Sequence, residues 1–234
     1  MVKIVAEIPA RYGSKRVKLK NLRLLDNKPL IYYAINAAKE AKTISEVYVN
    51  TESDLIGKVG IDNGVNYYKR NPGLAEDGIS SDEFNYDFMK HVPSDIVVMV
   101  NPVAPLITGR DIDDMVNYFL RSNLDTLIPI REENMHAFCA DKNGIIQPVN
   151  FQVNGRLAMT QKNVPIKICA WTVCIWKTKN FIEHFEKKGY AVFSGKLGFY
   201  PQPKLKAVKI STEEDFILAE ILLRNQGRQH IQVS

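Results

Sequence analysis

One short segment concentrates the residues that could bind an anion. Between Ala10 and Asn21 the chain carries five cations within ten residues, together with a glycine and a serine. Arginine holds phosphate oxygens through paired hydrogen bonds, lysine acts as a point charge, and glycine lets the backbone approach a ligand. The segment therefore predicts a site for several phosphate oxygens. The residues that could contact phosphate are Arg11, Gly13, Ser14, Lys15, Arg16, Lys18 and Lys20.

The position of this basic loop narrows its interpretation. It follows an apolar run, Val2 to Ile8, that predicts a first strand. In an open parallel sheet, ligands bind beyond the carboxyl ends of the strands, which favours phosphate binding over a solvated basic loop. The loop matches neither G-x-x-x-x-G-K-S/T nor G-x-G-x-x-G, so a P-loop nucleoside triphosphatase and a dinucleotide-binding fold lose support. Contact with RNA stays open as an alternative.

The basic loop resembles the signature of the acylneuraminate cytidylyltransferase family, roughly P-A-R-x-x-S-K-x-x-x-x-K-N. Members of that family activate sialic acid and related nonulosonic acids with CTP, and the related KDO cytidylyltransferases share the start of the motif. The resemblance implies that Arg11, Ser14 and Lys15 hold the triphosphate, with Gly13 in the nucleotide site. It also implies that Lys20 stabilises charge on the α-phosphate and that Asn21 orients the loop. The matching residues are Arg11, Ser14, Lys15, Lys20 and Asn21.

Later segments are similar to the same family, in the same order along the chain. Residues 47–52 resemble its V-x-V-S-T-D strand end, 70–81 its R-P-x-x-L-A-x-D-x-A-S-S segment, and 101–106 its Q-P-T-S-P-L segment. The family resemblance implies an α/β fold, a nucleotide-diphospho-sugar transferase-like three-layer sandwich with a mostly parallel central sheet. Because the second segment forms the cytosine pocket in the family, it implies three base contacts: Arg70, Ile79 and Ser81.

The pattern breaks where the family holds magnesium. Its two aspartates near the C-terminus correspond here to Lys209 and Ser211. Magnesium prefers carboxylate and phosphate oxygens, and a lysine repels it, so Mg²⁺ is implied by resemblance alone and we predict no metal ligand. Three interpretations stay open. Lys209 replaces the charge of the metal at the phosphates and takes part in catalysis; Glu213, Glu214 or Asp215 restores a metal site; or catalysis has been lost.

The acceptor side also departs from the family. Asn101 stands where the family has glutamine, and we predict acceptor contacts from Asn101, Arg156 and Gln161. Asn150 belongs to a polar segment that is either an acceptor pocket or an ordinary loop. The resemblance implies a CTP-dependent transfer of CMP to an acidic sugar, such as a nonulosonate, with release of pyrophosphate. The alternatives are a small phosphonate or phosphorylated acid as the acceptor, or a nucleotide-binding homologue without turnover.

The elements that must position these residues alternate between apolar strands and amphipathic helices. Repeated strand–helix units predict a mostly parallel sheet covered on both faces. The apolar periodicity places Leu55, Ile56 and Val59 on the inner side of one helix. We expect strands near 2–8, 47–49, 65–68, 95–100 and 126–130, and helices near 30–42, 53–63, 81–91 and 111–122.

The pattern changes after residue 137. We expect a hairpin over 137–149 that turns at Asn143-Gly144, one strand over 168–176 containing a core Trp171, and a helix over 179–187. A strand over 205–210 and a helix starting at Ser211 or Thr212 follow. We therefore predict one domain over 1–234, with an inserted lobe at about 137–200. The family resemblance implies that this lobe binds the acceptor and crosses over to a second subunit in a homodimer.

Composition bounds the remaining possibilities. The 234 residues are 45% hydrophobic and 24% charged, an ordinary globular composition. The 31 lysines and arginines exceed the 26 acids, and their clustering in one loop favours a phosphorylated small molecule over nucleic acid. No run approaches the 18 apolar residues that suggest a membrane span, and the start of the chain lacks a signal-peptide pattern. We expect a cytoplasmic protein that binds neither nucleic acid nor membrane.

Overall fold

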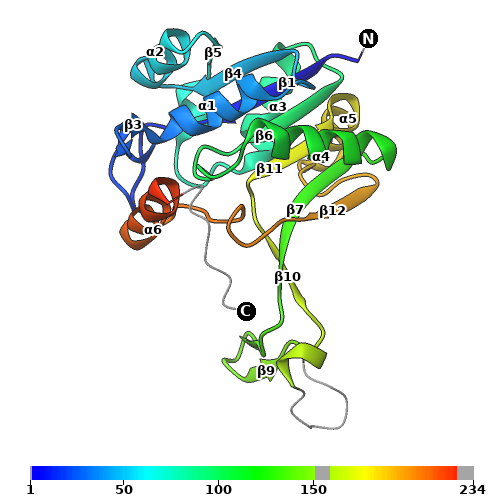
Figure 1. Cartoon of the computed structure of the whole chain (residues 1–234). Helices are drawn as coiled ribbons and strands as arrows, with labels where there is room; N and C mark the ends of the chain where they lie inside the picture. The colour runs from blue at the N-terminus through cyan, green and yellow to red at the C-terminus, as the bar shows by residue number, and fades with distance from the viewer. Residues whose placement is uncertain (1, 151–158, 226–234) are drawn as a thin grey trace.

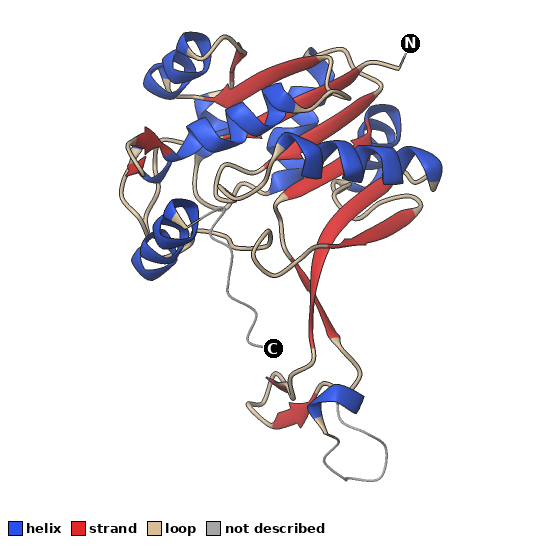
Figure 2. Ribbon diagram, in the orientation of Figure 1, coloured by secondary structure: helices blue, strands red, loops and turns tan. Residues whose placement is uncertain are grey.

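The computed structural model describes residues 2–150 and 159–225. An eight-stranded sheet forms its centre (Figures 1 and 2). Its strands are β1 (Ile4–Pro9), β4 (Glu46–Thr51), β5 (Asn66–Lys69), β6 (Ile96–Val100), β7 (Thr126–Glu133), β10 (Ile166–Cys169), β11 (Val173–Lys177) and β12 (Leu197–Pro201). The order is β10-β7-β11-β6-β1-β4-β5, with β12 beside β7. Four strand pairings are parallel and three are antiparallel, so the sheet is mostly parallel, as predicted.

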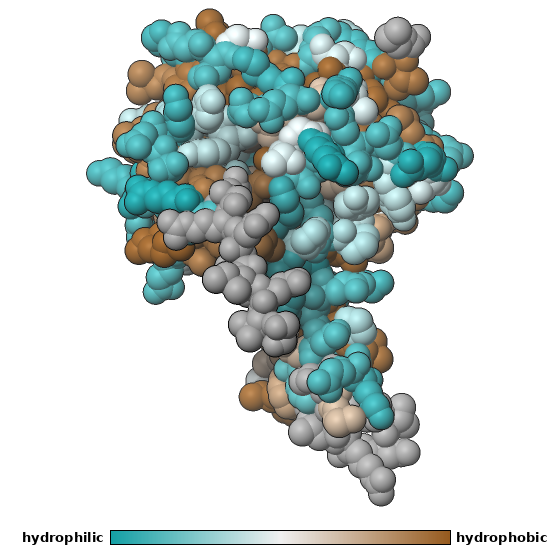
Figure 3. Space-filling view, viewed as in Figure 1, coloured by the Kyte–Doolittle hydropathy of each residue, from teal (hydrophilic) through white to brown (hydrophobic). Residues whose placement is uncertain are grey.

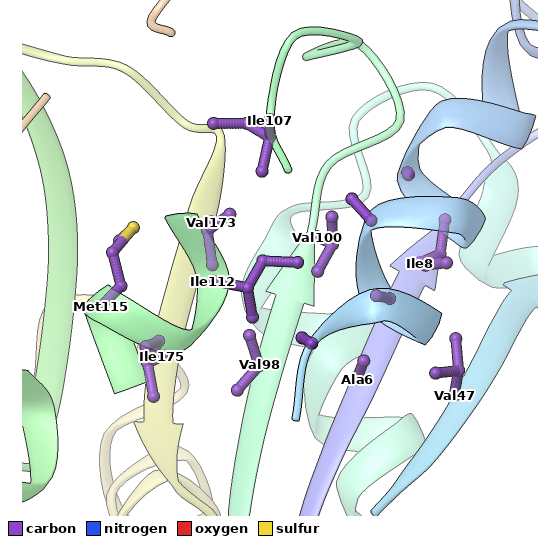
Figure 4. Close-up of a cluster of buried hydrophobic side chains, with 14 of the residues drawn as sticks. Ala6, Ile8, Val47, Val98, Val100, Ile107, Ile112, Met115, Val173 and Ile175 are labelled. Atoms are coloured by element: carbon purple, nitrogen blue, oxygen red, sulfur yellow. The ribbon is translucent and has the colours of Figure 1, made fainter. Parts of the chain in front are cut away.

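Helices cover both faces of the sheet, which confirms the predicted three-layer α/β fold (Figure 1). One face carries α1 (Leu30–Glu40), α2 (Asp54–Asp62) and α4 (Gly109–Arg121), whose apolar side chains share one core with the strands. Figure 4 shows Ile112 and Met115 of α4 beside Val98 and Ile175 of the sheet. The opposite face carries α3 (Ser81–His91) and α5 (Thr178–Lys188).

The helix predictions hold in type, with one error in orientation. On α2, the Ser53 hydroxyl accepts a hydrogen bond from the Ile56 N–H, as the cap predicted. Ile56 is buried, but Leu55, which we expected to face inward, is 60% exposed. Successive helical side chains point about 100° apart, so these two residues cannot share one narrow apolar stripe. The side of α2 that faces the sheet carries Ile56 and Gly60, and Gly60 lies against Val49 of β4.

Two strand predictions near the C-terminus are wrong. The run over 168–176 is two strands, β10 and β11, with Trp171 between them at a φ of +54°. The segment 205–210 is irregular, and the strand lies earlier, at β12. Strand β12 contains Gly198, where a Cβ atom would lie 2.2 Å from the Leu124 side chain. A glycine and a proline made this segment resemble a loop, although close packing explains the glycine.

A narrow arm projects from the body of the molecule (Figures 1 and 3). It contains the predicted hairpin, β8 (Phe138–Ala140) with β9 (Ile146–Pro148), and the short helix η3 (Thr160–Lys162). Strands β7 and β10 pair to form its stem. The segment expected as one lobe over 137–200 is therefore divided, because residues 173–201 return to the body as β11, α5 and β12.

The arm exposes apolar side chains to an unusual degree. Figure 3 shows hydrophobic surface on it in brown. An exposed patch of this kind marks an interaction surface more often than a free surface. Among the residues that the structure describes, no helix is long and apolar enough to cross a membrane. The apolar arm residues that are more than half exposed are Met135, Phe138, Ile145, Ile146, Val149, Met159 and Val164.

Candidate nucleotide-binding cleft

The basic loop is held in place from both of its ends. It leaves the carboxyl end of β1, and the Asn21 side-chain amide donates a 3.0 Å hydrogen bond back to the Arg11 carbonyl. In the middle of the loop Val17 is fully buried in a cluster that includes Phe216 of the last described helix, α6 (Glu213–Arg224). The apolar plug fixes the loop backbone, so the cations on either side of Val17 are left at its rim.

A cleft of about 460 Å³ opens beside this loop. Its walls come from the basic loop, from the segment after β5, from the carboxyl end of β6 and from the chain before α6. A second hollow of about 370 Å³ adjoins it and shares Arg11, Lys20 and Asn101. Segments far apart in the sequence therefore meet at one edge of the sheet, where parallel sheets place their ligands.

Most of the predicted site residues lie around these two hollows. The smaller hollow is lined by Ser14, Lys15 and Asn21. Gly13 instead faces a shallow hollow beside Glu52, and a Cβ atom there would meet nothing within 4 Å. Nothing in the cleft of this structure therefore requires a glycine at that position. The predicted residues that line the larger cleft are Arg11, Lys20, Arg70, Ile79, Ser81, Asn101 and Lys209.

One acidic side chain pairs with two cations of the basic loop. Asp77 accepts a 3.1 Å hydrogen bond from Arg11 and forms an ion pair with Lys15. These two cations hold the pKa of Asp77 below its usual value. The Lys15 side chain is 76% exposed, so the pairs are screened by solvent and readily exchanged. Asp77 thus balances charge that an anionic ligand would otherwise neutralise.

Lys20 is the most perturbed cation of the cleft. Burial, and then the nearby charges of Arg16, Lys209 and Arg11, lower its pKa to about 8, while Asp215 opposes the shift. The Lys20 ammonium donates a 3.2 Å hydrogen bond to the Ile210 carbonyl. Four cations therefore converge where burial makes their mutual repulsion costly. A polyanion in the cleft would relieve that repulsion.

The chain before α6 positions Lys209 by backbone contacts. The Ile210 N–H donates a 2.9 Å hydrogen bond to the Val103 carbonyl after β6, and the Ile210 side chain is buried. This anchor directs Lys209 and Ser211 into the cleft wall. The position that the family resemblance associates with magnesium is thus occupied by an ammonium and a hydroxyl.

The nearby acids do not restore a metal site. Asp215 caps α6, because its carboxylate accepts the Ser211 and Thr212 N–H groups at 2.7 and 2.9 Å. Burial alone would raise its pKa, but these hydrogen bonds and the Lys209 charge hold it below the usual value. Glu213 pairs with Arg23 at 2.5 Å. In the described part of the chain no three His, Cys, Asp or Glu side chains converge, and this donor set does not fit magnesium.

The base side of the cleft is built differently. Arg70 follows β5 directly and is 3% exposed. Its guanidinium donates to the Ala10 carbonyl at 2.8 Å and to the Glu52 carboxylate at 3.1 Å, and it lies 5.3 Å from the centre of the Phe84 ring. Arg70 is therefore held in a single orientation against the cleft wall before any ligand arrives.

Of the predicted acceptor residues, the two that the structure describes lie apart. Asn101 lines the cleft, Gln161 is exposed on the arm, and Arg156 lies outside the described residues. Asn150, a possible acceptor residue, is buried in the arm, where its side chain bonds the Met135 and Val164 carbonyls at 2.8 Å. Asn150 thus holds the arm together.

Several residues that line the cleft were not predicted from the sequence, among them Phe84, Met99 and Trp171. Trp171 was expected in the core; it is partly buried and packs against a core cluster, and it also lines the cleft and lies edge-on against Phe193. A positive φ at a tryptophan is uncommon and often accompanies a functional site. The unbroken apolar run over 168–176 hid the corner at which Trp171 turns outward.

Comparison with known proteins agrees with this geometry. Residues 5–169 match the sequence profile of the cytidylyltransferase family, described simply as "Cytidylyltransferase". The chain belongs to that family. It is 25% identical over 219 residues to N-acylneuraminate cytidylyltransferase A of Danio rerio. The aligned region covers 93% of this chain and 50% of the relative. The chain thus spans about half the length of the first curated relatives that it matches.

Two further similarities extend over whole chains. Post-translational flagellin modification protein B of Campylobacter coli is 26% identical over 239 residues, and 98% of each chain is covered. A solved structure of CMP:2-keto-3-deoxy-manno-octonic acid synthetase complexed with CTP superposes with a TM-score of 0.69, at 14% identity. It covers 96% of this chain and 99% of the other. At that identity the structural likeness concerns the fold.

Proposed function

We propose that the protein is a CTP-dependent cytidylyltransferase that joins CMP to an acidic sugar and releases pyrophosphate. The observation that carries this proposal is the convergence of the basic loop, Arg70 and Lys209 on one cleft. The cations of the basic loop can bind a triphosphate, and Arg70, a hydrogen-bond donor held in one orientation, can bind the acceptor atoms of a base. Family membership supports the same activity.

The reaction forms one bond at phosphorus and breaks another. An oxygen of the acceptor attacks the α-phosphorus of CTP in line, and the bond from that phosphorus to the bridging oxygen of pyrophosphate breaks. The electron pair of that bond leaves with pyrophosphate, and the acceptor proton passes to solvent. Catalysis of this kind consists mainly of positioning and of stabilising charge.

Each residue then has a role in the proposed reaction. Arg11, Ser14 and Lys15 bind the outer phosphates, and Asn21 keeps the loop closed. Lys20 stabilises charge at the α-phosphate and the leaving group, where its lowered pKa rises as the phosphates enter. The remaining roles are base contacts for Arg70, Ile79 and Ser81, and neutralisation of the phosphates for Lys209.

The ammonium of Lys209 stands where a metal would otherwise supply positive charge. A lysine there supports charge replacement, because it contributes a cation without needing carboxylate ligands. Among the described residues, the side chains beside Lys209 do not form a magnesium site. The same observation favours a second candidate, a nucleotide-binding homologue that does not turn CTP over.

The acceptor site involves Asn101 and Trp171, and we propose that the arm completes it in a homodimer. The exposed apolar residues of the arm support this assembly, because such a surface is costly to leave in water. An acidic sugar fits a cleft whose cations outnumber its acids, and a smaller phosphonate or phosphorylated acid would use the same charges. We place the protein in the cytoplasm, together with its CTP.

Pyrophosphate release tests the proposal directly. CTP would be incubated with a panel of nonulosonic acids, KDO, small phosphonates and phosphorylated acids, with and without magnesium. We expect release with one acidic sugar and with CTP in preference to ATP, GTP and UTP. Release without magnesium would support charge replacement by Lys209. CTP binding without release on any acceptor would favour the non-catalytic homologue, and no CTP binding would refute both.

A further inference from the structure

A polar cluster is buried under the base side of the cleft. Glu7 on β1 is fully buried, and its Oε1 atom accepts a 2.6 Å hydrogen bond from the Asn50 amide on β4. Within the described residues, three polar atoms of this cluster lack a hydrogen-bond partner: Glu7 Oε2, Asn50 Oδ1 and Arg70 Nε. Burial of a carboxyl group and an amide with unpaired atoms is costly, so their position beneath a ligand site indicates a functional role.

The cluster connects the interior of the sheet to the cleft wall. Ala10 bonds both sides of it, since its N–H donates to the Asn50 carbonyl at 3.0 Å and its carbonyl accepts from Arg70 at 2.8 Å. Met99 lies beside Glu7 in the strand register and lines the cleft. The path from Glu7 through Asn50 and Ala10 to Arg70 thus ends at the predicted base contact.

The protonation of Glu7 fits such a role. Burial raises its pKa to about 8, although the Asn50 hydrogen bond and the Arg70 charge oppose the shift and Asp87 adds to it. The charged and titratable groups that face Glu7 are therefore Arg70 after β5, Asp87 on α3 and Tyr68 on β5. At neutral pH Glu7 is an uncharged acid, which supports Asn50 without drawing the positive charge of Arg70 away from a ligand.

We propose that Glu7, acting through Asn50, is a positioning residue that holds Arg70 in place to recognise the cytosine base. A guanidinium only donates hydrogen bonds. Cytosine offers acceptors at O2 and N3, whereas uracil carries a hydrogen on N3. A fixed Arg70 therefore favours cytosine, and a displaced one loses the preference. The inference rests on the proposed function, because it requires a cytidine nucleotide in the cleft.

Calorimetric binding of CTP, UTP and inorganic tripolyphosphate separates base recognition from phosphate binding. We expect Asn50→Ser to weaken CTP binding about tenfold, to reduce the preference for CTP over UTP, and to leave tripolyphosphate binding within about twofold. Glu7→Gln keeps the shape and hydrogen bonding of the neutral acid, so its CTP affinity should stay within about twofold at about pH 7. Glu46→Gln, at a partly exposed acid that pairs with Lys3, is the matched control.

The pH profile gives a readout that a merely structural role would not move. Between about pH 7 and about pH 9, the ratio of CTP to tripolyphosphate affinity should fall about threefold in the wild type as Glu7 ionises and attracts Arg70. In Glu7→Gln the ratio should stay constant. Titration of Lys20 acts on both phosphate ligands, so the ratio removes its effect.

Thermal unfolding verifies the titration independently of any ligand. The folded-state pKa of Glu7, about 8, lies above its usual value of 4.5. The stability that protonated Glu7 contributes is therefore lost as the pH rises from 4.5 to about 8. Glu7→Gln should therefore raise the Tm more at about pH 8 than at about pH 5. An equal change at both would refute ionisation of Glu7 in this range.

Three binding results would overturn the inference. Equal losses of CTP and tripolyphosphate affinity in Asn50→Ser would mean that the pair only supports the loop. A ratio that still falls with pH in Glu7→Gln would assign the effect to another group. A wild type that binds tripolyphosphate but not CTP would refute the proposed function and this inference with it, whereas CTP binding without turnover would leave the test of Glu7 intact.

Discussion

The two sides of the cleft handle charge in opposite ways. On the phosphate side, Lys15 and Arg11 have side chains that are 76% and 39% exposed, and Asp77 pairs with both. On the base side, Arg70 is 3% exposed and bonded to backbone and carboxylate. Screened cations adapt to a flexible triphosphate, whereas a buried donor selects among planar bases of similar size. Attraction and selectivity are therefore carried by different elements.

Removal of the most buried phosphate-side cation should have the largest effect. Lys20→Met should lower turnover about 100-fold, because Lys20 acts where charge develops and water is scarce. Lys18→Met, an exposed cation of the same loop, is the control and should change turnover less than about twofold. Equal losses in the two variants, measured by pyrophosphate release, would show that only the net charge of the loop matters.

A change on the base side should affect affinity and selectivity instead. Arg70→Lys keeps the charge but loses the planar fork, so CTP should bind about tenfold more weakly and the CTP-to-UTP preference should shrink. Tripolyphosphate binding should hardly change. Arg110→Lys, on the exposed side of α4, controls for the substitution itself. An equal loss of tripolyphosphate binding would mean that Arg70 acts on the phosphates as a charge and does not distinguish a separate base side.

The pH dependence of phosphate binding sharpens the comparison. In the free protein Lys20 loses its proton near pH 8, and bound phosphates raise its pKa. Above about pH 8, binding must therefore take up a proton, so tripolyphosphate affinity falls as the pH rises, by at most about tenfold per pH unit. Calorimetry in buffers of different ionisation enthalpy would count that proton. Lys20→Met should show no uptake.

The smallest effect should come from the exposed acid. Asp77→Asn frees Arg11 and Lys15, so CTP should bind about threefold more tightly at low salt. The gain should vanish at high ionic strength, since the pairs are exposed. Asp62→Asn, which breaks the exposed pair with Lys58, is the control. Weaker binding in Asp77→Asn would mean that Asp77 orders the loop instead of competing with the ligand.

The sequence predicted the cleft best where short-range patterns carry the information. The basic loop, the helix that starts after Ser53 and the buried faces of α1 and α4 follow from periodicity, capping and a contiguous motif. The cleft position of Trp171 and the strand β12 escaped prediction, because long-range packing decides them: the chain turns at Trp171 between β10 and β11, and contact with Leu124 requires Gly198. The buried Glu7 looked like an interruption in an apolar strand, and only the fold places Asn50 beside it.

The plug at Val17 has a consequence for synthesis on the ribosome. The basic loop is made long before α6, yet Val17 shares a buried cluster with Phe216, and Lys20 bonds the Ile210 carbonyl, some 190 residues later. Strand β12 of the sheet ends at Pro201 and α6 begins at Glu213, so the sheet and the helix that closes the loop become available close together. The basic loop therefore reaches its final set of contacts only after α6 has been made.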